Sequence, residues 1–129
     1  ALINAFSHFL LDKLETEDGI RLKVKEIARD ISENFYDSSI DLQEILKKSG
    51  YSVDYIRGQF RKIMGKTPTD FLTEVRIHHA CYLMDIYAHT IALSEIAEKC
   101  GFSDIYHYSK SFKKIIGVSP GTYNKSTIT

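Results

Sequence analysis

The sequence predicts an all-helical protein with two helix-turn-helix lobes joined by a long connecting helix and preceded by an extra N-terminal helix. Apolar residues recur at helical spacing along most of the chain, which contains only 2 prolines and 7 glycines. A turn centred on glycine between two short amphipathic segments occurs twice, about fifty residues apart. The 129 residues can form one modest core or two small ones, and they leave no room for a separate catalytic domain.

Two amphipathic segments precede the first turn. Residues 2–15 are expected to form a helix that ends before Asp18-Gly19, with apolar side chains at Leu2, Ile3, Phe6, Phe9, Leu10 and Leu14. This helix either packs on the domain, which we favour, or acts as a linker or dimerisation helix to an upstream domain. Residues 21–35 are expected to form the next helix, with an apolar side made by Leu22, Ile27, Ile31 and Phe35. The chain begins without methionine, which we interpret as a fragment of a longer protein.

The first lobe carries clear helix start and stop signals. Asp41 and Glu44 have the spacing of a capping box, which predicts a helix that begins at Leu42. Gly50 can adopt the left-handed conformation that ends this helix, and Ser52 can cap the next one. These residues predict a short helix, a tight turn and a second helix.

The connecting helix is predicted from its two ends. Gly65 stops the preceding helix, Thr67-Pro68 supplies an N-cap followed by proline at the first helical position, and the apolar pattern continues to Tyr87. The chain therefore divides into an N-terminal helix, a first lobe, a connecting helix and a second lobe, at residues 1–19, 20–66, 67–88 and 89–129.

The two lobes are copies of one unit. At an offset of 51, five residues of the first lobe match the second: Glu44, Ile45, Gly50, Tyr51 and Ser52 match Glu95, Ile96, Gly101, Phe102 and Ser103. At an offset of 52, the ends match: Phe60, Arg61, Lys62, Ile63, Gly65, Thr67 and Pro68 match Phe112, Lys113, Lys114, Ile115, Gly117, Ser119 and Pro120. Two similar basic units imply that each lobe makes a similar contact with the ligand of the protein.

The charge distribution supports this interpretation better than the net charge does. The chain holds 17 basic and 17 acidic residues, and a net charge of zero is not the basic footprint expected of a nucleic-acid-binding protein. However, two segments are basic: residues 41–66 hold 6 basic and 3 acidic side chains, and residues 91–129 hold 5 basic and 3 acidic ones. The other two segments are acidic: residues 1–40 hold 5 basic and 8 acidic side chains, and residues 67–90 hold 1 basic and 3 acidic ones. Both basic blocks coincide with the predicted helix-turn-helix units.

The second helix of each unit has a polar face opposite its apolar one. The buried faces are predicted from Ile56, Phe60, Ile63, Met64, Tyr108, Phe112, Ile115 and Ile116. Our candidates for reading DNA bases lie opposite these: Val53, Asp54, Arg57, Arg61, Ile105, Tyr106, Ser109 and Lys110. Arginine and lysine donate to guanine O6 and N7, and apolar side chains contact thymine methyl groups. The candidates for binding phosphate, which positions a protein without reading sequence, are Lys62, Lys66, Lys113 and Lys114.

A single basic helix face is usually only a solvated surface. Two such faces in matching positions after matching turns favour DNA as the ligand. Ile105 and Tyr106 strengthen this interpretation, because large apolar groups on the outward face of a short helix need something to cover them.

Residues 21–125 resemble the DNA-binding domain of AraC/XylS-type bacterial transcription regulators, which has two helix-turn-helix lobes joined by one long helix. The resemblance rests on Glu95-Ile96-Ala97, Gly101-Phe102-Ser103-Asp104, Tyr108-Ser109-Lys110, Phe112-Lys113-Lys114 and Gly117-Val118-Ser119-Pro120. It implies sequence-specific binding of double-stranded DNA at an operator or promoter, with two recognition helices in successive major-groove segments. It also implies RNA polymerase as a partner and a sensory domain upstream, such as a ligand-binding cupin or a receiver domain. The alternative function is a helical protein–protein interaction module.

Three residues depart from the pattern of this family. Gly58 lies where an arginine is usual, and it weakens its helix by about 1 kcal/mol relative to alanine. Leu46 replaces the small residue that the second copy keeps as Ala97. Ala92 occupies the position of the Asp41 cap, which costs roughly 1 kcal/mol. We therefore expect the second lobe to contribute the larger share of recognition.

The sequence contains no pattern typical of an active site, a metal site or a membrane span. His78 and His79 are adjacent and cannot form an i, i+4 metal-binding pair. Cys81 and Cys100 are expected to be small core residues with reduced thiols. No apolar run approaches the roughly 18 residues that cross a bilayer. We therefore predict a cytoplasmic protein that is not an enzyme and binds no cofactor or metal.

Overall fold

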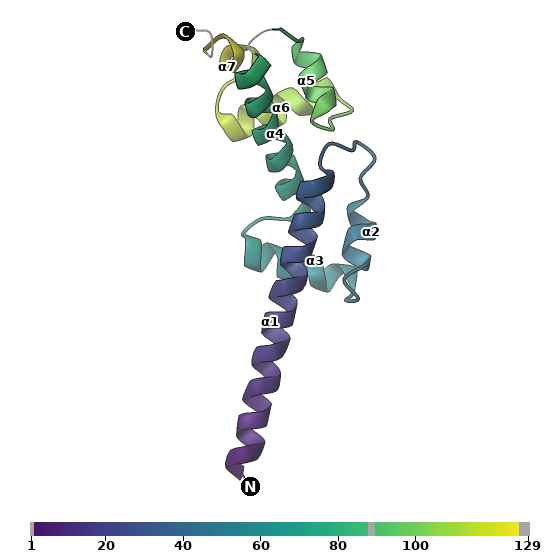
Figure 1. Ribbon diagram of the computed structural model, residues 1–129, viewed down its shortest axis with the longest axis vertical. Helices are drawn as coiled ribbons and strands as arrows, with labels where there is room; N and C mark the ends of the chain where they lie inside the picture. Colours follow the sequence, from purple (N-terminus) through teal and green to yellow (C-terminus); the bar gives the residue numbers. More distant parts are fainter. Residues whose placement is uncertain (1, 88–89, 127–129) are drawn as a thin grey trace. The chain divides into compact units, whose positions relative to one another are not determined.

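The computed structural model describes the backbone of residues 2–87 and 90–126 and the side chains of residues 17–87 and 90–124 (Figure 1). These residues form only helices, which confirms the predicted fold class. The helices are α1 (Leu2–Asn34), α2 (Leu42–Lys47), α3 (Val53–Met64), α4 (Pro68–Tyr87), α5 (Leu93–Lys99), α6 (Ile105–Ile116) and α7 (Pro120–Ser126). None of the helices in this part of the chain is long and apolar enough to cross a membrane.

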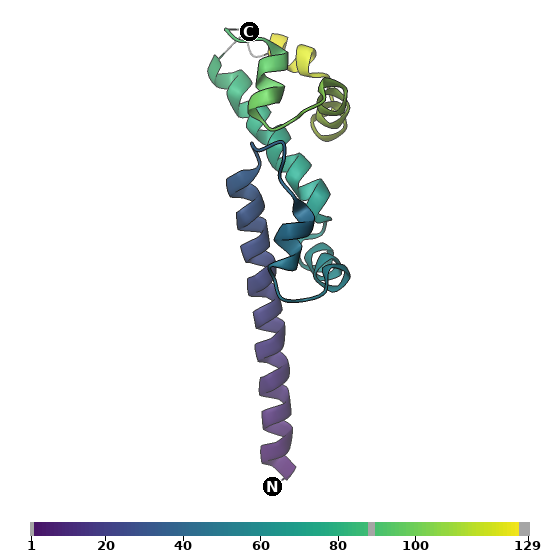
Figure 2. The same cartoon turned by 90° about the vertical axis from the view of Figure 1, so that its right-hand side faces the viewer.

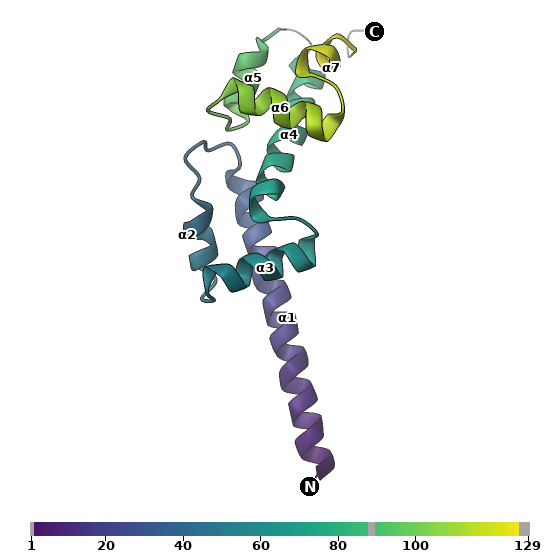
Figure 3. The same ribbon diagram turned by 180° about the vertical axis from the view of Figure 1, so that it is seen from behind.

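The chain forms two compact units. Unit 1 consists of residues 1–30 and 42–68, and therefore holds most of α1 together with α2 and α3. Unit 2 consists of residues 31–41 and 69–129, and holds the end of α1 and the helices from α4 onward. Figure 3 shows the short turn that joins α2 to α3 and the similar turn that joins α5 to α6.

Helix α1 is continuous from Leu2 to Asn34, so the predicted helix end before Asp18-Gly19 is wrong (Figure 2). A glycine inside a helix costs only about 1 kcal/mol relative to alanine. Ile20, the next residue, is 7% exposed, and its burial outweighs that cost. The apolar side chains predicted between residues 2 and 15 lie outside the described side chains, so their packing or dimerisation role stays a prediction.

Unit 1 buries one stripe of α1 together with the apolar faces of α2 and α3. The buried residues are Ile20, Val24, Ile27, Ala28, Ile45, Leu46, Ile56 and Phe60. Leu22 is 56% exposed, so its predicted place on the apolar side of α1 is wrong. It lies about 200° around the helix from Ile20, and therefore on the opposite face. Leu46 is buried, so the larger residue at this repeat position fits in the core of the first lobe.

Unit 2 has a core rich in aromatic side chains. Tyr108 and Phe112 of α6 are fully buried, in a cluster that includes Ile77, Ala80, Met84, Ile96, Ala97, Cys100 and Phe102. The Tyr108 ring contacts the rings of Phe102 and Phe112 at centroid distances of 5.3 and 5.9 Å, and Phe112 contacts Tyr123 at 5.6 Å. These contacts fix α6 by its inner face and leave its outer face free for function.

The cap of α5 provides a stability prediction. Ala92 is its N-cap and makes no side-chain hydrogen bond, as the sequence predicts. Glu95 follows three residues later, so Ala92→Ser would complete a capping box. We expect this variant to gain about 1 kcal/mol in free energy of unfolding, measured by urea denaturation. Ala92→Val is the control, because valine also lacks a capping oxygen, and equal stability of the serine variant and the wild type would contradict the prediction.

Candidate nucleic-acid interface

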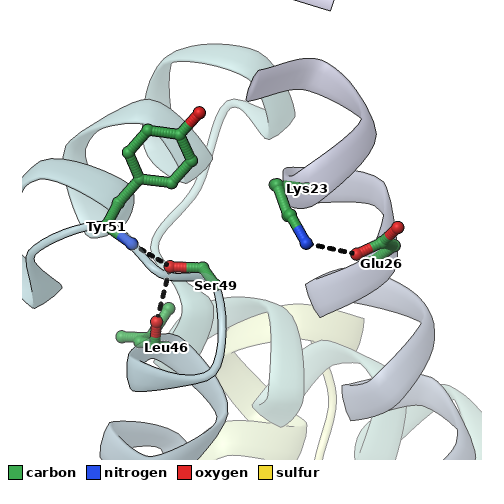
Figure 4. A network of polar contacts seen from close by, with 5 residues as sticks. All are labelled: Lys23, Glu26, Leu46, Ser49 and Tyr51. Atoms are coloured by element: carbon green, nitrogen blue, oxygen red, sulfur yellow. Dashed lines mark hydrogen bonds and ion pairs between the residues drawn. The ribbon is translucent and has the colours of Figure 1, made fainter. Parts of the chain in front are cut away.

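The turn of the first lobe is held by local hydrogen bonds. Gly50 has a φ of 85°, the left-handed conformation expected from its position. The buried Ser49 hydroxyl donates to the Leu46 carbonyl oxygen at 2.7 Å and accepts from the Tyr51 amide at 3.2 Å (Figure 4). The Ser52 hydroxyl then accepts from the Tyr55 amide at 3.3 Å and caps α3 as predicted. The direction in which α3 leaves the turn is therefore fixed.

Helix α3 presents the polar face that the sequence predicts. Ile56 and Phe60 are fully buried, and Gly65 ends the helix with a φ of 80°. On the other side, Asp54 and Arg61 are exposed. The remaining base-reading candidates of α3, Val53 and Arg57, are half-buried.

An ion pair lies on this polar face of α3. The Arg57 Nη1 donates to Asp54 Oδ1 at 3.1 Å. The Asp54 side chain is 98% exposed and that of Arg57 is 40% exposed, so water screens the pair and it adds little to stability. In this pair, the guanidinium group lies beside the Asp54 carboxylate on the polar face of α3.

The second lobe repeats this arrangement with a better cap. Gly101 has a φ of 90° in the turn after α5. The Asp104 carboxylate accepts from the Tyr106 amide at 2.9 Å and caps α6, which ends at Gly117 with a φ of 98°. The repeat predicted from the sequence thus has the same local structure in both lobes.

The outer face of α6 combines apolar and basic side chains. Tyr106 is 79% exposed and Ile105 is 42% exposed, while Ser109, Lys110 and Lys113 are also exposed. Within the same helix, Tyr108 and Phe112 face the core. An exposed tyrosine beside lysines is the composition that contacts base edges and phosphates together.

The candidate phosphate-binding lysines lie near the ends of the same two helices. Lys62 of α3 and Lys113 and Lys114 of α6 are exposed, and Lys66 just beyond α3 is half-buried. Lys62, Lys113 and Lys114 occupy the last turn of their helices. The long, flexible side chain of a lysine in such a position can bring its ammonium group to a DNA phosphate without contacting the bases.

Arg76 of α4 has a structural role that no local sequence pattern indicates. Its guanidinium Nε donates to the Phe35 carbonyl oxygen at 2.8 Å and its Nη2 donates to that of Asp37 at 3.0 Å. The guanidinium also lies 5.7 Å from the Phe102 ring centroid. Arg76 is 8% exposed, and this burial lowers its pKa, which the charge of Asp37 opposes. Its signal in the sequence was its place as the one basic residue of segment 67–90.

Gly101 lies against the same segment that Arg76 binds. A Cβ at this position would overlap the Phe35 carbonyl oxygen and lie 3.0 Å from Arg76 Nε. The segment after α1 is itself fixed by Ser39, whose amide and hydroxyl donate to Asp37 Oδ1 at 2.9 and 2.6 Å and lower the pKa of Asp37. The turn before α6 is thus packed tightly inside unit 2.

The described histidines and cysteines do not gather into a metal-binding cluster. Among the described residues, no group of three His, Cys, Asp or Glu side chains is placed to hold a metal ion. Cys100 is fully buried, and burial raises the pKa of its thiol to about 12, so it is a poor nucleophile at neutral pH. Cys81 is half-buried, and burial raises its pKa too.

Two capped helices, each with a polar face after a glycine turn, define the chain as a helix-turn-helix protein. A family model described as a helix-turn-helix domain matches residues 45–126. The chain belongs to the AraC/XylS family of transcription regulators and is a DNA-binding domain. Proteins of this family are transcription regulators rather than enzymes.

Individual relatives agree with this assignment. The chain is 30% identical over 125 residues to the Msm operon regulatory protein of Streptococcus mutans, covering 97% of this chain and 43% of that protein. It is 38% identical over 85 residues to the transcriptional activator RhaR of Klebsiella pneumoniae, covering 65% of this chain and 29% of that one. The solved C-terminal domain of AraT, a response regulator from Geobacillus stearothermophilus, matches with a TM-score of 0.72 and 26% identity, covering 81% and 84% of the two chains. The chain thus spans less than half the length of these two curated relatives.

Proposed function

We propose that α3 and α6 both enter the major groove of duplex DNA, in successive segments, and read base edges through their exposed faces. The residues that read bases are Val53, Asp54, Arg57, Arg61, Ile105, Tyr106, Ser109 and Lys110. The observation that carries this proposal is the outer face of α6, where the 79% exposed Tyr106 lies near the exposed Lys110. The opposite face of this helix packs in the core through Tyr108 and Phe112. An uncovered aromatic ring of this kind favours a ligand that buries it.

The chemistry of the two faces indicates which bases each helix prefers. Ile105 and Tyr106 offer apolar surface at the start of α6, where it fits thymine methyl groups. Lys110, one turn further, donates to guanine O6 and N7. We therefore propose that α6 selects a site with both thymine and guanine.

The lysines at the far ends of both helices are proposed to bind phosphates. Lys62, Lys66, Lys113 and Lys114 supply positive charge beside the reading faces. Phosphate contacts of this kind fix the register of the protein on DNA and make its affinity depend on salt. They carry most of the affinity for unrelated sequences.

In the whole protein, we propose that DNA occupancy is coupled to a signal and to transcription. The curated relatives are longer than the region that this chain matches, which supports a further domain in the whole protein, and we propose a sensory domain upstream. RNA polymerase is the partner that a DNA-bound regulator would contact, and the cytoplasm is where both would meet. The role is one of binding, with no catalytic step.

Two lysine substitutions test the assignment of roles on α6. We expect Lys114→Ala to weaken binding of all duplexes a few-fold and to reduce the slope of log affinity against log salt by about 1. Lys110→Ala is expected to relax the preference at one or two base pairs by about tenfold. Binding is measured by fluorescence anisotropy, and preference by selection from random duplexes.

The control is Lys25→Ala, which removes an exposed lysine from α1. It should leave preference unchanged. If Lys110→Ala and Lys114→Ala had the same effect on every sequence, the division between base reading and phosphate binding would be wrong. Binding of a protein partner without any binding of duplex DNA would favour the interaction-module alternative.

A further inference from the structure

We propose that Asp54 determines the base specificity of α3, by holding Arg57 for contact with guanine and by accepting a hydrogen bond from the amino group of a neighbouring cytosine. This inference rests on the proposed function, because it requires α3 to lie in the major groove. Beyond the proposed function, α3 selects guanine and cytosine, and Asp54 disfavours sites that lack the cytosine.

The geometry of the pair leaves its outer atoms available to DNA. Asp54 Oδ1 and Arg57 Nη1 are 3.1 Å apart, and this contact uses one of the five N–H donors of the guanidinium. A guanine presents O6 and N7 as two adjacent acceptors, which match a pair of the other donors. Because Asp54 restricts the guanidinium before DNA binds, less side-chain freedom is lost on binding.

The charge of Asp54 is the second part of the argument. A carboxylate that is 98% exposed on a DNA-facing helix repels phosphates, so it lowers affinity unless a donor meets it. The donor that cytosine presents in the major groove is its N4 amino group, and aspartate is a partner that accepts from it. Asp54 therefore favours sites with cytosine and disfavours other sequences.

The corresponding part of α6 has no such pair. At the repeat offset of 52, Asp54 and Arg57 correspond to Tyr106 and Ser109, and the sequence of α6 contains no acidic residue. Asp104 lies just before α6, but its carboxylate accepts from the Tyr106 amide as a cap. The two helices therefore differ in chemistry, because only α3 carries a carboxylate that can accept from cytosine.

Gly58 supports a close approach of DNA beside this pair. It is exposed on the same side of α3, and apart from its chain neighbours and the adjacent backbone of α3 no described atom lies within 4 Å of the point where a Cβ would be. Packing within the described protein thus gives no reason for a glycine that weakens the helix. A bare backbone next to Arg57 lets a base edge lie close to the helix.

The test compares wild-type protein with Asp54→Asn in selection from random duplexes and in affinity measurements. Wild type is expected to select guanine and cytosine at neighbouring positions of one half of the site. Asp54→Asn should lose about tenfold discrimination at the cytosine position and should bind unrelated duplexes a few-fold more tightly, since one negative charge is gone. Arg57→Lys should relax the guanine position, because lysine lacks the planar fork.

Glu44→Gln is the matched control. Glu44 pairs with Lys47 at 3.4 Å with the same i, i+3 spacing, but on α2. This variant should keep the wild-type base preference, and urea denaturation checks that both variants stay folded. This inference would be overturned if the protein still bound DNA but Asp54→Asn kept the wild-type base preference. It would also be overturned if this variant lost the same affinity for every sequence. Absence of any duplex binding by wild type would instead overturn the proposed function.

Discussion

The Gly101→Ala variant is expected to lose about 4 kcal/mol of free energy of unfolding, which for a domain of this size is a large part of its stability. Two effects combine. A non-glycine residue at a φ of 90° is strained by about 1–2 kcal/mol. The new Cβ would also overlap the Phe35 carbonyl oxygen, which is a backbone atom and cannot rotate away. The acceptor of the Arg76 hydrogen bond would have to move with it.

Gly50→Ala is the matched control for this prediction. Gly50 occupies the equivalent turn of the first lobe and has a φ of 85°, but no described atom beyond its two chain neighbours lies within 4 Å of the point where its Cβ would be. It should therefore lose only the conformational part, about 1–2 kcal/mol. Urea denaturation followed by far-UV circular dichroism measures both. Equal losses would show that the close packing around Gly101 has no energetic weight.

The Arg76→Met variant is expected to lose about 3 kcal/mol, because it leaves two carbonyl oxygens of the segment after α1 without their buried donor. Methionine keeps much of the side-chain volume, so the loss reports the hydrogen bonds rather than a cavity. Arg76→Lys keeps the charge but not the planar fork that reaches Phe35 and Asp37 at once, and should recover less than half of the loss. The measurement is again urea denaturation.

The two predictions are coupled, which provides a sharper test. Gly101 and Arg76 both act on the Phe35 carbonyl, so the double variant should lose less than the sum of the single losses. Strict additivity would mean that the two residues act independently, contrary to the packing described for unit 2. Stability of unit 2 matters for function because α6 is fixed by the same core.

Local signals allowed most of the helices and the outward faces to be predicted from sequence. Ser52 caps α3, Pro68 begins α4, and the glycines after α3 and α6 end their helices, because each of these residues acts within a few positions of itself. Tyr108 and Phe112 could be assigned to the buried face since helical periodicity alone separates them from Lys110.

The features that were missed depend on contacts between distant residues. Gly19 looked like a helix end, but burial of neighbouring side chains against other helices carries α1 through it. Arg76 binds carbonyl oxygens about 40 residues earlier in the chain, and no local pattern encodes such a contact. The base-reading and phosphate-binding roles remain predictions, since they concern atoms of DNA rather than of the protein.

The salt dependence of binding to duplex DNA tests the central claim most directly. If the four candidate lysines each neutralise a phosphate, log affinity should fall linearly with log salt concentration with a slope of about −4. Fluorescence anisotropy of a labelled duplex, titrated with the intact chain at several salt concentrations, gives this slope. A steep fall would support insertion of α3 and α6 beside the DNA backbone, and no detectable binding of any duplex at low salt would contradict it.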